Sequence, residues 1–188
     1  MGVDQLSFVS RETIQKLRAF EALVLKWTKK INLVSSGDAQ HLWDRHIIDS
    51  AQIYPHAPPS GDWLDIGSGG GFPGIVVAII GAELDPQRRF TFVDSDQRKC
   101  AFLRTVSREL DLSATVLAAR VDEIPPIGAT VLTARALDDL TSLLYHAERH
   151  LLASGTALFP KGASWQKENE EAMKFWSYSL DVISSETN

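Results

Sequence analysis

Hydrophobic and polar positions follow one helical period over the first part of the chain. After Ser10, apolar residues recur every three or four positions as far as Ile31, which predicts an amphipathic helix with Ser10 as its N-cap. Asp38 is a candidate cap for a second helix. The apolar residues of that helix are Leu42, Trp43, Ile47 and Ala51. Three prolines and a glycine between positions 55 and 61 then end the helical part.

From residue 62 onward, short apolar runs typical of buried strands alternate with helical segments. The predicted strands cover residues 62–66, 89–93, 114–117, 130–132 and 156–159, and helices are expected after Gly74, at 98–110 and at 137–152. This alternation predicts right-handed crossovers and a mostly parallel sheet with helices on both faces, an α/β fold. We expect an N-terminal helical extension over residues 1–60 and an α/β core over 61–188, together forming one compact domain.

Composition narrows the class of protein. With 188 residues, 44% of them hydrophobic, the chain can bury one sizeable core. The longest apolar run, at residues 75–80, is far shorter than the ~20 residues of a membrane helix. Met1 to Leu6 have neither the basic nor the apolar region of an export signal, so we expect a cytoplasmic protein. Cys100 is the single cysteine, which excludes an internal disulfide; we expect it in the core and expect no metal site.

A glycine-rich loop follows the first predicted strand and carries most of the chemical information. The segment reads Asp-Ile-Gly-Ser-Gly-Gly-Gly-Phe-Pro-Gly over residues 65–74. Glycines here let the backbone turn sharply and approach a ligand closely. The helix that begins after them offers free N–H groups to a polar ligand. The loop therefore predicts a cofactor site, with a tight turn that binds nothing as the alternative.

Two cofactors fit this loop in different registers. Counted from Gly69, the pattern Gly69-x-Gly71-x-x-Gly74 matches the dinucleotide fingerprint, with Asp94 roughly 20 residues further on. Counted from Asp65, the pattern acid-x-Gly-x-Gly-x-Gly is similar to motif I of class I methyltransferases, which use S-adenosylmethionine (SAM). The second register is favoured because its first glycine, Gly67, directly follows the strand. In either case Asp94 ends the second strand, where a carboxylate can bind ribose hydroxyls; capping of the next helix is the alternative.

The order of several motifs resembles one family. The matching segments are Asn32-Leu33-Val34, Trp43-x-Arg45-His46-Ile47-Ile48-Asp49-Ser50, the loop at 65–74, Val93-Asp94-Ser95, Phe102-Leu103-Arg104, Thr133-Ala134-Arg135-Ala136 and Pro160-Lys161-Gly162. The chain is thereby identified as similar to the RsmG (GidB) family, class I Rossmann-like methyltransferases that methylate guanine N7 in small-subunit (16S) ribosomal RNA. The resemblance implies SAM as cofactor and the ribosomal RNA or small subunit as partner. It places SAM contacts at Gly67, Phe72, Val121, Asp122 and Arg135, to which the motif and the ribose argument add Asp65, Gly69, Gly71 and Asp94.

Arg135 and Lys161 are the expected catalytic residues, because they follow the fourth and fifth strands where the family meets its RNA. Guanine N7 has a free lone pair, so alignment with the SAM methyl group supplies most of the rate and no general base is needed. The Asn/Asp-Pro-Pro-aromatic tetrad of amine methylating enzymes is absent after residue 132. The alternatives are a salt bridge from Arg135 to Asp65 or Asp94, and a solvated turn at Lys161.

His46 has no obvious proton to transfer in this reaction. Asp49, one helical turn on, can orient its imidazole or pair with Arg45. We expect a structural or RNA-positioning role for these three residues, with packing of the N-terminal helices as the alternative.

Net charge opposes an RNA substrate, since a formal charge of −5 does not attract phosphate. Local basic clusters soften this objection. They are Lys26, Lys29 and Lys30, and Arg98, Lys99, Arg104 and Arg108. A SAM enzyme for a small molecule and a noncatalytic nucleotide-binding module stay open as alternatives. We expect a monomer, and at residues 180–183 the first strand of the antiparallel hairpin that usually ends this kind of sheet.

Overall fold

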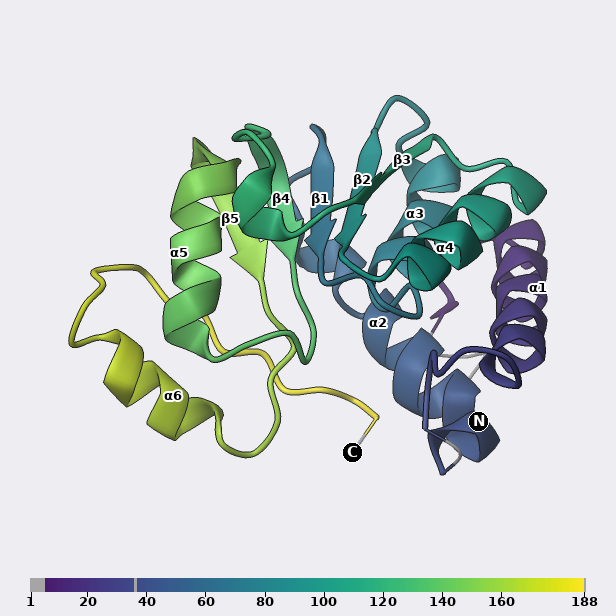
Figure 1. Cartoon of the computed structure of the whole chain (residues 1–188), viewed down its shortest axis with the longest axis horizontal. Helices are drawn as coiled ribbons and strands as arrows, with labels where there is room; N and C mark the ends of the chain where they lie inside the picture. Colours follow the sequence, from purple (N-terminus) through teal and green to yellow (C-terminus); the bar gives the residue numbers. More distant parts are fainter. Residues whose placement is uncertain (1–5, 36, 188) are drawn as a thin grey trace.

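Five parallel strands form the centre of the molecule, in the order β3-β2-β1-β4-β5 (Figure 1). The computed structural model describes residues 6–35 and 37–187; residues 1–5, which carry most of the expectation about an export signal, lie outside this part. The strands are β1 (Trp63–Ile66), β2 (Phe90–Asp94), β3 (Ala114–Ala118), β4 (Ala129–Thr133) and β5 (Leu151–Leu158). The α-helices are α1 (Arg11–Thr28), α2 (Asp49–Ala51), α3 (Gly74–Leu84), α4 (Gln97–Glu109), α5 (Leu140–His150) and α6 (Trp165–Ala172). The predicted α/β class is confirmed, and the order is doubly wound.

The alternation of side chains along each strand divides the core into two clusters. Trp63, Phe92 and Val131 pack into one cluster with α3 and α4, whereas their neighbours Leu64 and Leu132 pack into the other with α5. All of these side chains are buried. Both faces of the sheet are therefore covered, as expected for parallel strands.

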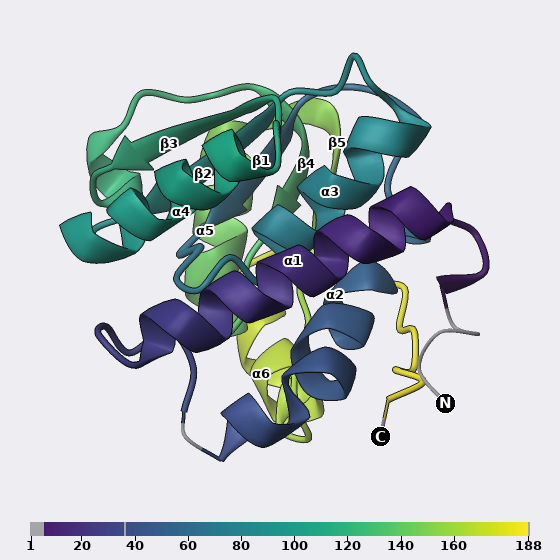
Figure 2. The ribbon, with the colours of Figure 1, turned by 90° about the vertical axis from the view of Figure 1, so that its right-hand side faces the viewer.

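Helix α1 forms an outer layer over α3 and α4. Figure 2 shows it crossing in front of α3, with α2 below. Its buried side chains include Leu17, Phe20 and Val24, which belong to the same cluster as α3. Residues 74–81 of α3 are all buried, because the helix lies between the sheet and α1. The predicted N-cap is confirmed by a 3.2 Å hydrogen bond from the Thr13 backbone N–H to Ser10 Oγ.

The second helical segment differs from its prediction. It consists of a 3₁₀ turn (Asp38–His41), a π-helical stretch (Trp43–Ile48) and the short α2. Asp38 does not cap it; Ser35 Oγ accepts a 3.1 Å hydrogen bond from the Asp38 backbone N–H. A π-helical stretch is uncommon and is frequently found at functional sites.

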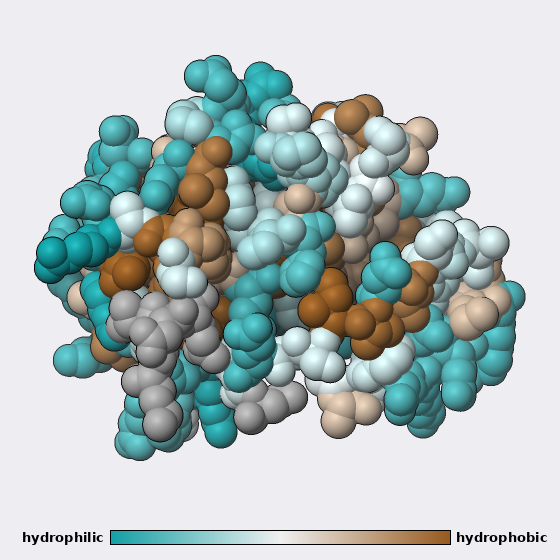
Figure 3. Space-filling view, turned by 180° about the vertical axis from the view of Figure 1, so that it is seen from behind, coloured by the Kyte–Doolittle hydropathy of each residue, from teal (hydrophilic) through white to brown (hydrophobic). Residues whose placement is uncertain are grey.

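Two predictions near the C-terminus are wrong. Helix α5 ends at His150 and β5 begins at Leu151, so the helix predicted as far as residue 152 is too long and the strand predicted from 156 too short. Residues 180–183 form no strand in the described chain, since no neighbouring strand pairs with them. They lead back to α2, where Ser185 Oγ donates a 3.0 Å hydrogen bond to Asp49 Oδ1. In this segment Val182 is 58% exposed. Hydrophobic patches also interrupt the hydrophilic surface on the rear face of the molecule (Figure 3).

The division of the chain at residue 60 stays a prediction. Among the described residues, no helix is long and apolar enough to cross a membrane. The same part of the chain contains no group of three or more His, Cys, Asp or Glu side chains placed to hold a metal ion.

Candidate functional site

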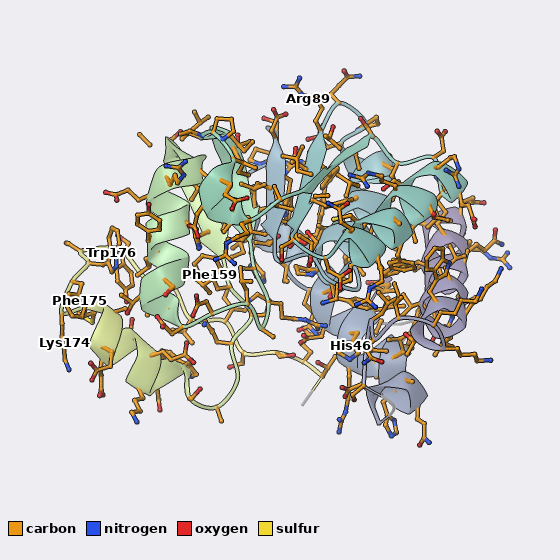
Figure 4. The ribbon with its side chains drawn as sticks, in the orientation of Figure 1. His46, Arg89, Phe159, Lys174, Phe175 and Trp176 are labelled. Carbon is orange, nitrogen blue, oxygen red and sulfur yellow. The ribbon has the colours of Figure 1, made fainter. Side chains whose placement is uncertain are left out.

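The carboxyl ends of the five parallel strands share one edge of the sheet, and the predicted site residues follow these ends. Figure 4 shows His46 on the same side as Phe159, which directly follows β5, and Arg89 on the opposite side, just before β2. In open α/β sheets the carboxyl edge is where ligands bind. The topology therefore gathers residues that are far apart in the sequence.

The glycine loop leaves β1 in a left-handed conformation at alternate positions. Gly67, Gly69 and Gly71 have φ angles of 63°, 51° and 89°, and residues other than glycine rarely adopt such positive values. At Gly71 an added Cβ would also lie 2.7 Å from an atom of Ile75. These three glycines are required by the backbone, as the sequence indicated.

Asp65 lies at the base of this loop and is completely buried. Its Oδ1 accepts a 2.7 Å hydrogen bond from Thr133 Oγ1, which in turn accepts one of 3.0 Å from Trp63 Nε1. Its Oδ2 has no hydrogen-bond partner among the described residues and lies where a Cβ on Gly74 would come within 2.5 Å. Burial raises the pKa of Asp65 to about 6, and the Thr133 hydroxyl opposes this shift.

Asp94 joins the ends of β1 and β2. One carboxylate oxygen accepts a 2.8 Å hydrogen bond from the Gly69 backbone N–H, and the other accepts one of 2.8 Å from the Asp96 N–H. The N-cap of α4 is Asp96 and not Asp94, because Asp96 accepts from the Arg98 and Lys99 backbone N–H groups. The capping alternative for Asp94 is therefore wrong, and its carboxylate faces the glycine loop.

Arg135 leaves β4 toward the N-terminal helices. Its guanidinium lies over the Phe72 ring, 5.3 Å from the ring centre, and donates a hydrogen bond to His46 Nδ1. Its ion pair, at 3.7 Å, is with Asp49; the expected alternatives, Asp65 and Asp94, form no ion pair with it. Burial lowers the pKa of Arg135, and the nearby carboxylates oppose this. Phe72 is thus the point where the glycine loop and Arg135 meet.

Lys161 is held by its neighbours and does not lie in a solvated turn. Its Nζ donates to Glu168 Oε2 at 2.7 Å and to the Asp138 carbonyl at 2.9 Å. Asp138 belongs to the loop after β4, so Lys161 connects that loop with the one after β5. Within the described part of the chain, no hydrogen bond or ion pair joins Lys161 to Arg135.

Val121 and Asp122 occupy a 3₁₀ turn after β3 (Val121–Glu123). Asp122 is exposed and faces His146 Nδ1 at 3.7 Å and Arg120 at 3.8 Å. The structure places both predicted residues at the carboxyl edge of the sheet, after β3.

A basic cleft of about 310 Å³ lies beside the Asp94 turn. It is lined by Lys30, Ile31 and Asn32, which follow α1, and by Asp96, Arg98 and Lys99 at the start of α4. The sequence showed both basic clusters, but it gave no signal that Lys30 and Lys99 share one cleft.

The contact of Arg135 with His46 and Asp49 is the main feature that sequence reasoning missed. The signal was the short spacing of Arg45, His46 and Asp49, which suggested pairing within one helix. Arg45 instead lies 3.5 Å from Asp38 and is exposed.

Comparisons with known proteins point to one family. The family model described as GidB, rRNA small subunit methyltransferase G, matches residues 13–186. The ribosomal RNA small subunit methyltransferase G of Ruegeria pomeroyi is 52% identical over 179 residues, which are 95% of this chain and 88% of the relative. The protein of the same name from Paramagnetospirillum magneticum is 41% identical over 100% of this chain and 91% of the relative.

Solved structures agree on the fold. A SAM-dependent methyltransferase from Aquifex aeolicus superposes with a TM-score of 0.56 at 14% identity, covering 79% of this chain and 87% of that one. Coclaurine N-methyltransferase gives a TM-score of 0.52 at 13% identity, covering 80% and 53%. These likenesses show the class I methyltransferase fold.

Proposed function

This chain belongs to the rRNA small subunit methyltransferase G family, and we propose that it transfers the SAM methyl group to N7 of a guanosine in 16S ribosomal RNA. The main support for the proposal is the arrangement of residues at the carboxyl edge of the sheet. There the glycine loop, Asp94 and Arg135 come together through direct contacts, although up to about 70 residues separate them in sequence.

The loop and the acids around it fit SAM. The glycine backbone leaves room for a ligand, and the Asp94 carboxylate beside Gly69 suits the two ribose hydroxyls. Asp65 Oδ2, which is buried and has no hydrogen-bond partner among the described residues, is a further acceptor at the start of α3. We assign cofactor contacts to Asp65, Gly67, Gly69, Gly71, Phe72, Asp94, Val121, Asp122 and Arg135.

Toward the RNA, Arg135 and Lys161 orient the substrate and do not transfer protons. SAM supplies an electrophilic methyl group, and an unprotonated ring nitrogen such as guanine N7 attacks it without a general base. Arg135 can bind guanine O6 or a phosphate as a hydrogen-bond donor, and Lys161 holds the loops after β4 and β5 together. Positioning by these groups, and not acid–base chemistry, supplies the rate.

The basic cleft gives the RNA a place to bind despite the net charge of −5. Lys30, Arg98 and Lys99 face one acid, Asp96, so the lining carries a positive excess. We expect Lys30→Ala and Lys99→Ala to weaken binding to the small subunit and each to reduce the salt dependence of binding by about one unit in log–log slope. Lys167→Ala, an exposed change on α6, serves as the control.

The decisive experiment is transfer of labelled methyl from SAM to small ribosomal subunits from cells that lack this protein. Label in 7-methylguanosine is the expected result. Label in another nucleoside refutes the N7 assignment, and turnover of small molecules without ribosomal particles favours the alternative enzyme class.

Variants test the site assignment in the same assay. Asp94→Ala should weaken SAM binding, whereas Arg135→Ala and Lys161→Ala should lower methyl transfer. Unchanged turnover in all three removes the assignment. We further propose a cytoplasmic monomer, in keeping with a ribosomal substrate and a single cysteine; light scattering of the purified protein tests the monomer.

A further inference from the structure

Three side chains hold the Arg135 guanidinium, and two of them lie outside the α/β core. His46 and Asp49 come from the segment before residue 60, and the third neighbour is the Phe72 ring. Arg135 has a side chain only 18% exposed, so its long, flexible stem does not sample many rotamers. These contacts fix where its remaining N–H groups point.

His46 acts toward Arg135 as a hydrogen-bond acceptor. The guanidinium has donors and no acceptor, so His46 Nδ1 must present its lone pair. The opposite nitrogen, Nε2, lies 4.0 Å from Asp38 Oδ1 and has no hydrogen-bond partner among the described residues. A proton on Nε2 faces that carboxylate and leaves Nδ1 free to accept.

The neutral form of His46 suits this role. Burial and then Arg135 lower its pKa, while Asp38 and Asp49 oppose the shift and Arg45 adds to it. The ring also lies 5.1 Å, centre to centre, from the Phe72 ring, so His46 contacts both partners at once. It therefore connects the guanidinium with the glycine loop.

Asp49 supplies the charge that balances Arg135. Its Oδ1 accepts hydrogen bonds from Ser185 Oγ at 3.0 Å and Thr187 Oγ1 at 3.3 Å. These hydroxyls fix the carboxylate with Oδ2 toward Arg135 Nη1, at 3.7 Å. The C-terminal segment thus stabilises the ion pair by holding the Asp49 carboxylate in place.

We propose that His46 and Asp49 are positioning residues, which hold the Arg135 guanidinium over Phe72 so that it can contact the cofactor and the target base. This inference rests on the proposed function, since it takes Arg135 as a residue of the site. It gives the π-helical stretch and α2 a part in the reaction beyond packing.

Two substitutions at His46 distinguish the role of its hydrogen-bond acceptor from the role of its ring. His46→Phe keeps the ring against Phe72 and removes the acceptor; His46→Asn keeps an acceptor near Nδ1 and removes the ring. We expect His46→Phe to lower kcat/KM for methyl transfer roughly 10- to 100-fold, because the Arg135 guanidinium would lose its position. His46→Asn should retain most of the wild-type kcat/KM. Asp49→Asn should give a smaller loss. Asp44→Asn, an exposed change on the same stretch, is the matched control and should leave the rate unchanged.

A double-mutant cycle with Arg135→Ala decides whether His46 acts through Arg135. If it does, His46→Phe has no further effect on kcat/KM in the Arg135→Ala background. The proposal is overturned if the losses in kcat/KM from His46→Phe and Arg135→Ala multiply in the double variant. It is also overturned if His46→Asn is as slow as His46→Phe. Thermal unfolding of each variant identifies losses caused by misfolding.

The wild-type protein in the same experiment keeps the two proposals apart. Failure of the wild-type protein to methylate the small subunit overturns the proposed function. The cycle is then measured on the SAM dissociation constant, in which independent effects of His46 and Arg135 overturn the positioning role. Methyl transfer by the wild-type protein together with independent effects overturns the positioning role alone.

Discussion

Replacing Asp65 by asparagine should change how the stability of the protein depends on pH. Asp65 is fully buried, its Oδ1 accepts a hydrogen bond from Thr133 Oγ1, and burial raises its pKa from the ordinary value of 3.8 to about 6. The folded protein therefore binds this proton more tightly than the unfolded chain does. Between those two pKa values the native state holds more protons, so the free energy of unfolding falls as pH rises.

The magnitude follows from the size of the shift. A difference of roughly 2 pKa units corresponds to about 3 kcal/mol, present in full below pH ~4 and lost as pH rises through about 6. Asparagine does not titrate, so Asp65→Asn removes this slope. Its amide nitrogen takes the place of Oδ2 at the start of α3 and costs about 1–3 kcal/mol as a buried unpaired donor, at every pH alike.

Urea unfolding from pH 4 to pH 8 measures the effect as the difference between wild type and variant. Taking this difference removes the contribution of His46, which is the same in both proteins. The lowered pKa of His46 makes the stability of both rise with pH. We expect the wild-type advantage at pH 4 to shrink by about 3 kcal/mol by pH 7. Asp44→Asn should run parallel to the wild-type curve. A constant offset between wild type and Asp65→Asn at all pH values would refute the reasoning.

Three further changes test the surroundings of the site. Thr133→Val should destabilise the protein by about 2–4 kcal/mol in urea unfolding, because Trp63 Nε1 and the Asp65 carboxylate both lose a buried partner; a loss below about 1 kcal/mol contradicts this. Gly74→Ala should lower Tm in calorimetry, although alanine ordinarily gains about 1 kcal/mol in a helix, since its Cβ would lie 2.5 Å from Asp65 Oδ2; a higher Tm contradicts the clash. Ala136→Gly should raise the free energy of unfolding by about 1 kcal/mol, because Ala136 has a φ of 52°, and an unchanged value argues against strain.

The parts of the fold that could be predicted depend on local sequence. Strand β1 and the glycine loop are contiguous, so the buried run and the glycines identify both from one short segment, residues 63–74. The end of α5 could not be read, because His150 is followed at once by β5 with no glycine or proline between them. Three of the four residues at 180–183 are apolar and two of them are β-branched, as in many strands, but a strand also needs a neighbour to pair with, which no local pattern reveals.

The site was predictable in its position and not in its contacts. Each strand end brings its next residues to one edge, which places Asp94 and Arg135 there from topology alone. The hydrogen bond between Arg135 and His46 spans 89 residues and depends on how the N-terminal helices pack, so charge and spacing suggested nearer partners. Similarly, Asp94 and Asp96 are both plausible caps, and the hydrogen bond from Gly69 to Asp94 distinguishes them.

Two locally unfavourable features, the buried carboxylate of Asp65 and the left-handed backbone of Ala136, lie at the carboxyl edge. Asp65 has a raised pKa and an unpaired oxygen, and Ala136, directly after Arg135, is left-handed. Asp111 also has a φ of 52°, but it lies between α4 and β3, at the amino edge. Asp111→Gly should relieve similar strain without affecting methyl transfer, whereas Ala136→Gly should gain stability and loosen Arg135. Because Ala136 directly follows Arg135, methyl transfer by Ala136→Gly tests whether the backbone at position 136 contributes to the placement of the guanidinium.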